Sequence, residues 1–211
     1  MKNKIITFSG VDGAGKTTIL REFTKILEVK YKRQVKELRH RPSILPILSA
    51  IKHGKTLASE KTLEVLPRSG INKSKTSSLI RFTYYLIDYV LGQWFVYFKY
   101  TRKNILVIYD RYYFDFIVDA RRTNIDLNSK FIKWFYRFVF KPDINVFLYA
   151  SPEVILSRKQ EMDRDSIEKL TKDYKILFEG YKQRDNEVYM CIENIDMLKT
   201  LNSIENQLSN D

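Results

Sequence analysis

The sequence contains few of the residue types that build disulfides and zinc sites. Cys191 is the only cysteine among 211 residues, which excludes a disulfide within the chain and is typical of a reducing compartment. With one cysteine and two histidines, His40 and His53, the composition argues against a zinc site. The first residues lack the long apolar run of a signal peptide, so we expect a cytoplasmic protein.

Acidic residues are also scarce relative to basic ones. The formal net charge is +12, which indicates polyanionic partners such as nucleotides, nucleic acid or an anionic membrane, or simply a lysine-rich surface. We expect a nucleotide rather than a specific nucleic acid, and we do not favour a membrane surface. The hydrophobic fraction of 44% and the charged fraction of 29% are typical of a soluble globular protein, and the length predicts a single domain over residues 1–211.

One motif carries specific chemistry. Residues Phe8 to Thr18 read FSGVDGAGKTT and fit the pattern G-x-x-x-x-G-K-[ST], with Gly10, Gly15 and Lys16 in register. An apolar strand precedes the motif and an amphipathic helix follows it, which is the context that a phosphate-binding loop requires. The predicted ATP-binding residues are Gly10, Asp12, Gly13, Ala14, Gly15, Lys16, Thr17 and Thr18.

The chemistry of this loop assigns roles to two of its side chains. Lys16 would reach the β- and γ-phosphates, and the Thr17 hydroxyl would bind Mg²⁺. The glycines let backbone N–H groups turn inward, and the start of the helix adds partial positive charge. The sequence therefore predicts a nucleoside triphosphate site that uses ATP and Mg²⁺.

A second candidate site follows the apolar stretch from Asn104 to Tyr109. Asp110 stands at the end of this predicted buried strand, where a carboxylate would position Mg²⁺ through a water molecule. Arg111 follows directly, either as a phosphate clamp or as an ion-pair partner of Asp110. The aromatic run Tyr112–Phe114 could wall a base pocket or pack in the core.

The middle of the chain is less informative. Residues 43–76 predict an acceptor-side insert with a short amphipathic helix and a basic loop over 52–75, either a substrate flap or a solvated excursion. The following stretch, Ser77 to Tyr100, is apolar enough to be a transmembrane candidate. Arg81, Asp88 and Gln93 favour instead a long helix that is buried on most sides.

The second half predicts further strands and helices in alternation. Helices are expected from Asn128 to Phe140, from Ser151, over 167–184 and over 197–208, with strands at 144–149 and 188–192. The charged segment 158–165 predicts a lid, or an ordinary charged helix face. With strands at 4–8, 33–38 and 104–109, the fold class is α/β: a P-loop kinase fold with a five-stranded parallel sheet and helices on both faces.

The motifs resemble those of the thymidylate kinase family of nucleoside monophosphate kinases. The likeness rests on the loop at 8–18, on Asp110-Arg111-Tyr112, on the strand and Pro-Glu helix start at 146–154, and on the lid residues Arg158 and Arg164. It implies that Asp12 binds the sugar of the acceptor nucleotide and that Arg111 holds its phosphate. It also implies acceptor contacts by Arg41, Asp88 and Tyr112, a homodimer, and a catalytic lid arginine at Arg158 or Arg164, because Gly13 occupies a place where other members carry an arginine.

This sequence departs from the family pattern on the acceptor side. Arg39-His40-Arg41-Pro42-Ser43 replaces the usual Arg-Glu-Pro-Gly-Gly, and Asp88-Tyr89 replaces Asp-Arg. The resemblance predicts phosphoryl transfer from ATP to a nucleoside monophosphate, with dTMP as the best single acceptor. The alternatives are a related kinase for another nucleotide, a nucleoside, or a sugar- or lipid-linked substrate, and a nucleotide-dependent binding module.

Overall fold

The computed structural model describes residues 5–45, 74–182 and 187–209, and the chain divides into two compact units. The sheet unit comprises Met1–His40, Phe98–Tyr112 and Lys141–Asp211, and the helical unit comprises Arg41–Tyr97 and Tyr113–Phe140. The predicted basic loop at 52–75 lies almost entirely outside the described residues, as does most of the insert at 43–76. A single domain over 1–211 stays a prediction.

Five parallel strands form the core of the sheet unit, in the order β2-β3-β1-β4-β5. The three central strands are almost fully buried because helices cover both of their faces, whereas β2 lies at an edge and is only partly buried. All five strands were predicted, four of them from apolar runs and β2 from the short stretch 33–38, and the predicted fold class is confirmed. The strands are β1 (Ile5–Gly10), β2 (Val35–Arg39), β3 (Leu106–Asp110), β4 (Ile144–Tyr149) and β5 (Val188–Glu193).

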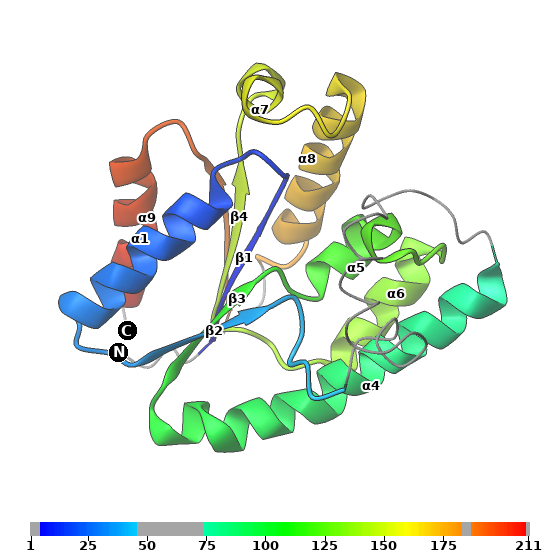
Figure 1. The fold of residues 1–211 in the computed structure, drawn as a ribbon, viewed down its shortest axis with the longest axis horizontal. Coiled ribbons are helices and arrows are strands. Elements are labelled where there is room, and N and C mark those ends of the chain that lie inside the picture. The colour runs from blue at the N-terminus through cyan, green and yellow to red at the C-terminus, as the bar shows by residue number, and fades with distance from the viewer. Residues whose placement is uncertain (1–4, 46–73, 183–186, 210–211) are drawn as a thin grey trace, which may run out of the picture. The chain divides into compact units, whose positions relative to one another are not determined.

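Helices cover the two faces of this sheet, as the sequence predicted. On one face, α1 (Lys16–Val29) and α9 (Met197–Ser209) pack on the buried cluster that includes Val146 and Leu148. On the other face lies α8 (Arg164–Glu179), whose Tyr174 stacks on Phe147 with ring centroids 4.5 Å apart. Neighbouring residues of one strand thus serve opposite layers, because side chains alternate along a strand. Figure 1 shows α1 and α9 on one side of the strands and α8 on the other.

Two side-chain caps frame the predicted lid. Ser151 caps α7 (Pro152–Arg158) by accepting a hydrogen bond from Val154 N at 3.4 Å, as its position before Pro152 predicted. Asp163 caps α8 by accepting from Ser166 N at 2.7 Å. The lid segment 158–165 is therefore the end of one helix, a short connection and the start of the next. Its movement stays a prediction.

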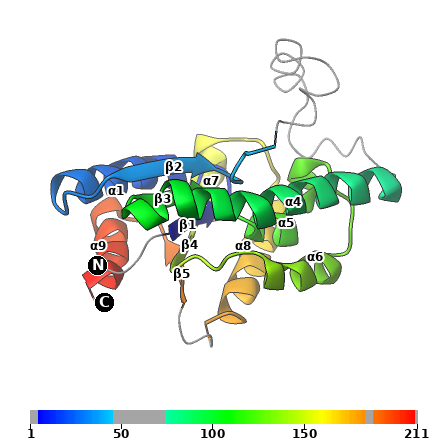
Figure 2. The same ribbon diagram turned by 90° about the horizontal axis from the view of Figure 1, so that it is seen from below.

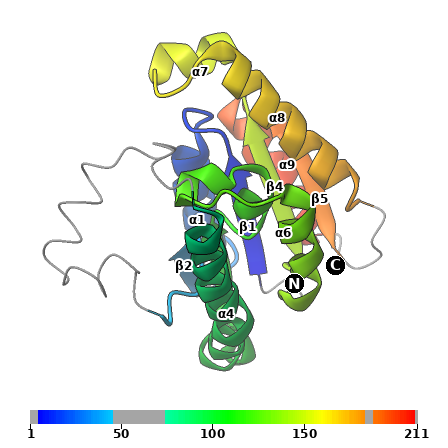
Figure 3. The ribbon, with the colours of Figure 1, turned by 90° about the vertical axis from the view of Figure 1, so that its right-hand side faces the viewer.

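The helical unit is built from α4 (Lys75–Lys99), which belongs to it up to Tyr97, and from α5 (Phe114–Val118) and α6 (Ser129–Phe135). Asn128 caps α6 by accepting from Lys130 N at 2.8 Å. The predicted helix up to Phe140 is wrong in its length, because the chain tightens into the 3₁₀ segment η3 (Tyr136–Phe138). Figure 3 shows α4 and α6 side by side. Two more 3₁₀ segments, η1 (Thr101–Lys103) in the sheet unit and η2 (Ala120–Thr123) in the helical unit, join longer elements.

The prediction that α4 is buried on most sides is wrong. One side of the helix is buried through residues such as Phe82, Tyr89 and Val96, whereas Leu91 and Trp94 on the opposite side are more than half exposed. Figure 2 shows the helix along its length. Within the described ranges, no helix is long and apolar enough to cross a membrane.

Candidate phosphate-binding site

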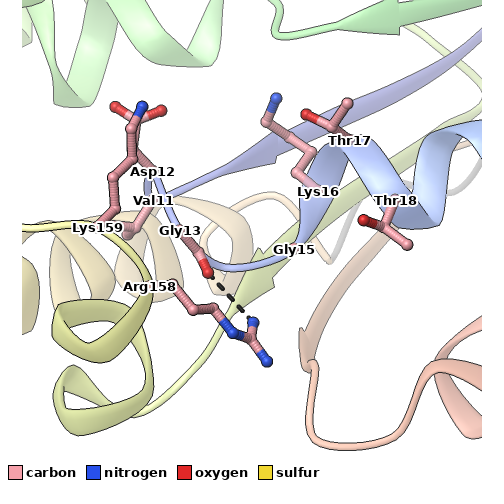
Figure 4. Close-up of a pocket in the computed structure, with 9 residues that line it drawn as sticks. All are labelled: Val11, Asp12, Gly13, Gly15, Lys16, Thr17, Thr18, Arg158 and Lys159. Atoms are coloured by element: carbon pink, nitrogen blue, oxygen red, sulfur yellow. Dashed lines mark hydrogen bonds between the residues drawn. The ribbon is translucent and has the colours of Figure 1, made fainter.

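The loop between β1 and α1 lines a cavity of about 270 Å³. Its walls combine this loop with the C-terminal end of α7 (Figure 4). The cavity therefore joins the predicted phosphate loop to the predicted lid. The lining residues are Val11, Asp12, Gly13, Gly15, Lys16, Thr17, Thr18, Arg158 and Lys159.

Two glycines of the loop adopt left-handed backbone conformations. Gly13 has a φ of 89° and Gly15 a φ of 81°, which residues with a side chain rarely adopt. Between them, Ala14 N donates to Val11 O at 3.2 Å, which closes a tight turn directly before α1. Turns of this kind can aim successive backbone N–H groups at a bound anion, at the positive end of the helix dipole.

Three carbonyl groups of the loop accept hydrogen bonds from side chains. Gly10 O accepts from Arg111 at 3.3 Å, Gly13 O from Arg158 at 3.3 Å, and Ala14 O from Asn194 at 2.8 Å. A carbonyl oxygen carries partial negative charge and would repel a phosphate. These bonds therefore hold the carbonyls in fixed directions and stabilise the loop geometry that phosphate binding requires.

Lys16 and Asp110 form an ion pair at the carboxyl edge of the sheet. Lys16 is buried as the first residue of α1, and Asp110 ends β3. The two meet because Asp110 is in register with Phe8 of β1, the strand that leads into the loop. The two charged groups predicted for the donor site are thus adjacent, and each neutralises the other.

Arg111 has an unusual backbone conformation, with a φ of 74°. Its backbone N donates to Phe8 O at 2.8 Å, and its guanidinium donates to Asp12 at 2.6 Å. A left-handed arginine costs conformational energy, and such strain is concentrated at functional sites. Asp12 and Arg111, two of the three predicted acceptor ligands in the sheet unit, therefore lie together beside the phosphate loop.

The two threonines of the motif lie in the first turn of α1. Thr17 and Thr18 are exposed and line the cavity. In Figure 4 the side chain of Lys16 points to the same side of the loop as that of Asp12. A magnesium ion bound with a nucleotide would find the Thr17 hydroxyl and the Asp110 carboxylate as protein oxygens, and both residue types suit this hard cation.

The structure separates the two candidate lid arginines. Arg158 lines the cavity, and in Figure 4 its guanidinium lies on the side of the loop away from the tip of Lys16. Arg164 is not among the lining residues and pairs instead with Glu168 at 2.9 Å and with Glu153 at 2.7 Å. The hydrogen bond with Glu168, and next the charge of Glu153, raise the pKa of Arg164. Of the two arginines, Arg158 is the one placed at the phosphate loop.

Sequence reasoning missed Lys159 and Asn194. Lys159 lines the cavity directly after Arg158, and its position in the charged segment was the available signal. Asn194 follows β5 and is far from the loop in sequence, so no local pattern points to it. Its amide is oriented by Thr200, whose hydroxyl donates to the Asn194 side-chain oxygen at 3.1 Å.

In the helical unit, Arg41 and Asp88 bind each other. Asp88 is fully buried, and each of its oxygens accepts two hydrogen bonds, which satisfies the carboxylate. The donors are the Arg41 guanidinium and the backbone N–H groups of the next segment: Ser43 N at 3.1 Å, Ile44 N at 2.9 Å and Leu45 N at 3.0 Å. The described conformation therefore gives Asp88 a structural role, and the acceptor contacts predicted for Asp88 and Arg41 stay predictions.

Tyr112 also has a packing role. Its side chain is fully buried in the sheet unit, with its ring centroid 5.0 Å from that of Tyr109. Burial raises the pKa of Tyr112 well above that of a free tyrosine, so the hydroxyl stays protonated. Acceptor binding by Tyr112 stays a prediction.

Comparison with solved structures gives a match over nearly the whole chain. A thymidylate kinase from Ehrlichia chaffeensis matches with a TM-score of 0.57, and the match covers 98% of each chain. The chain has a thymidylate kinase-like fold. Sequence identity is only 16%, so the likeness concerns the fold. No protein-family model and no curated protein sequence matches the chain.

The thymidylate kinase-like fold confirms, as a fold, the resemblance that the motifs indicated. In this chain the glycine loop follows β1 and Asp110 ends the neighbouring strand β3, at the carboxyl edge where parallel α/β sheets bind ligands.

Proposed function

We propose that the protein transfers the γ-phosphoryl group of Mg·ATP to a phosphorylated acceptor, with a nucleoside monophosphate as the acceptor class and dTMP as the best single candidate. One observation carries the proposal. Lys16 of the phosphate loop lines the cavity and lies beside Asp110 at the carboxyl edge of the sheet. A binding module needs the loop, whereas a kinase also needs cationic groups for a second phosphate, and Arg111 and Arg158 are available for that purpose.

On the donor side, we propose that Lys16 exchanges its partner. Without nucleotide its ammonium is neutralised by Asp110. When phosphates occupy the loop, Lys16 would turn to them, and Asp110 would become free to orient water beside the Thr17 hydroxyl. Magnesium would neutralise charge on the phosphates, which lowers the barrier to phosphoryl transfer.

On the acceptor side, we propose that the Asp12–Arg111 pair opens for the incoming nucleotide. Asp12 would accept a hydrogen bond from the sugar, and the Arg111 guanidinium would bind the acceptor phosphate. The strained backbone of Arg111, fixed by its bond to Phe8 O, keeps the side chain near the loop. Arg158 would give up its exposed bond to Gly13 O and turn toward the transferred group, where its charge stabilises the transition state.

A second candidate is a related kinase with a different acceptor. It is favoured by the pairing of Arg41 with Asp88, because these residues were expected to contact the acceptor and here satisfy each other. The alternative acceptors are another nucleotide, a nucleoside, or a sugar- or lipid-linked substrate.

The test is ADP release from Mg·ATP over a panel of dTMP, dUMP, other monophosphates, nucleosides and sugars. Stimulation by dTMP above all others supports the first candidate, and stimulation by another compound supports the second. Lys16→Ala should lower turnover by about 10²–10³-fold. The exposed Lys25→Ala on the same helix is the matched control, and equal turnover of the two variants would contradict the proposed donor site.

A further inference from the structure

The connection between β5 and α9 contacts the phosphate loop, although the two are 180 positions apart in the sequence. Asn194 stands directly after β5, and its side-chain amide donates to Ala14 O at 2.8 Å. The same amide packs against Gly15: a β-carbon added at Gly15 would lie 2.5 Å from the Asn194 amide nitrogen, which is too close for any side chain. The β5–α9 connection therefore supports the loop at the residues directly before α1.

The hydrogen bond to Ala14 O fixes the direction of one peptide group of the loop. Ala14 O and Gly15 N–H belong to the same peptide, and every peptide bond among the described residues is trans. In a trans peptide the C=O and the N–H point in opposite directions. The carbonyl held by Asn194 thus aims the Gly15 N–H away from Asn194, and Gly15 lines the cavity. Peptide N–H groups that are oriented in this way are the donors of an anion-binding loop.

The hydrogen-bond partners define which way the Asn194 amide faces. A carbonyl oxygen can only accept, so the amide NH₂ must face Ala14 O and the amide oxygen must face Thr200. The Thr200 hydroxyl donates to this amide oxygen at 3.1 Å. Loss of the hydroxyl would remove the bond that holds the amide in place and would let the side chain of Asn194 rotate.

The backbone on both sides of this amide is fixed. Thr200 is buried in α9, where its N–H donates to Asp196 O at 3.0 Å, and the Asp196 carboxylate caps the helix by accepting from Lys199 N at 2.9 Å. Asn194 N donates to Tyr149 O at 2.8 Å, which continues the pairing of β5 with β4. The side-chain torsions of Asn194 are therefore what the Thr200 hydroxyl restrains.

We propose that Thr200 is a positioning residue of the nucleotide site and acts through Asn194 on the peptide between Ala14 and Gly15. The hydroxyl holds the amide, the amide holds the carbonyl, and the carbonyl directs the Gly15 N–H toward the phosphates of the donor nucleotide. A loop that is ordered in advance binds more tightly, because less conformational freedom is lost on binding. This role rests on the proposed donor site and is independent of the acceptor.

A purely structural role is the alternative for Thr200, because a buried hydroxyl needs a hydrogen-bond partner in any protein. In that case, removal of the hydroxyl would lower stability, and any effect on nucleotide affinity would be independent of Asn194. A positioning role instead makes the effect of Thr200 on affinity depend on the Asn194 side chain. Substitution of the two residues, alone and together, separates the two roles.

The measurement is the affinity for Mg·ADP by titration calorimetry, which needs no acceptor. Thr200→Val removes the hydroxyl at nearly constant size and should weaken binding about threefold, and Asn194→Ala should weaken it about fivefold, as expected for single neutral hydrogen bonds. Because Thr200 acts through Asn194, the double variant should lose about fivefold and not about fifteenfold. Thr200→Ser keeps the hydroxyl and should bind within about twofold of the wild-type protein.

Two further variants complete the set. Asn194→Asp keeps the size of the side chain, but an ionised carboxylate cannot donate and repels both Ala14 O and the phosphates, so binding should weaken about tenfold or more. Thr24→Val is the matched control for Thr200→Val. The Thr24 hydroxyl donates to Glu37 at 2.8 Å, neither residue lines the cavity, and this variant should bind Mg·ADP as the wild-type protein does.

Either of two results would overturn the role of Thr200: unchanged affinity in Thr200→Val, or a loss in the double variant that equals the product of the two single losses. Circular dichroism checks that each variant is folded. If Thr200→Val does not fold, equal affinities of Asn194→Asp and Asn194→Ala would contradict the proposal instead. Failure of the donor site itself has a different signature, because Lys16→Ala and the wild-type protein would then bind Mg·ADP equally or not at all.

Discussion

The phosphate loop and the segment 41–45 are both irregular stretches that follow a strand of the same sheet, yet they are held in different ways. The loop is held by its own turn and by side chains from three separate places, Arg111, Arg158 and Asn194, each with one hydrogen bond to a carbonyl. The segment 41–45 is held chiefly by one carboxylate, that of Asp88.

The difference separates binding geometry from stability. Several weak bonds around the loop fix the direction of each peptide group, so the loss of one should impair nucleotide binding more than folding. In segment 41–45, four hydrogen bonds depend on the single buried carboxylate of Asp88. Loss of this carboxylate should therefore lower the stability of the fold more than it lowers catalytic activity. Single substitutions near the phosphate loop and at Asp88 test whether the two regions respond differently, in activity and in stability.

The largest effect is expected at the lid. Arg158→Ala should lower turnover by about 10²–10³-fold, because the charge placed at the phosphate loop is lost, with little change in the urea midpoint. Arg164→Ala is the matched control: it also removes an exposed arginine, but one that pairs with Glu153 and Glu168. It should change turnover by less than about threefold. Steady-state kinetics of both variants decide the matter. A larger loss in Arg164→Ala would assign the catalytic arginine to α8 instead.

The next effect concerns stability. Asp88→Asn leaves the buried Arg41 without its counter-charge and should lower the free energy of unfolding by about 3–5 kcal/mol, measured by urea denaturation. Asp173→Asn on α8 is the matched control, because it removes only an exposed pair with Lys169 and should cost less than about 0.5 kcal/mol. If both variants unfold at the wild-type urea concentration, Asp88 does not hold segment 41–45 as described.

The smallest effect is expected at Asn194. Asn194→Ala removes the donor to Ala14 O, and a neutral hydrogen bond contributes about 1 kcal/mol, so the KM for ATP should rise about fivefold with kcat nearly unchanged. Asn202→Ala, at an exposed position of α9, serves as the control and should leave KM as it is. A fall in kcat at constant KM would mean that Asn194 acts on the transition state rather than on the loop.

The sequence by itself determined the elements whose causes are local. The glycine turn after β1, the apolar runs of four of the five strands and the caps at Ser151 and Asn128 all depend on residues within a few positions of each other, and each was predicted correctly. Asp110 was also correctly placed at a strand end, because parallel strands bring their carboxyl ends to one edge.

Only the tertiary structure decided the partners of side chains that are distant in sequence. Asn194 reaches Ala14 across most of the chain, and Asp88 binds a segment more than forty positions away, so no periodicity could reveal either contact. The same holds for α4, because apolar residues lie on both of its sides. The hydrophobic effect favours burial of either side equally, so the sequence could not say which side the protein buries and which it leaves exposed.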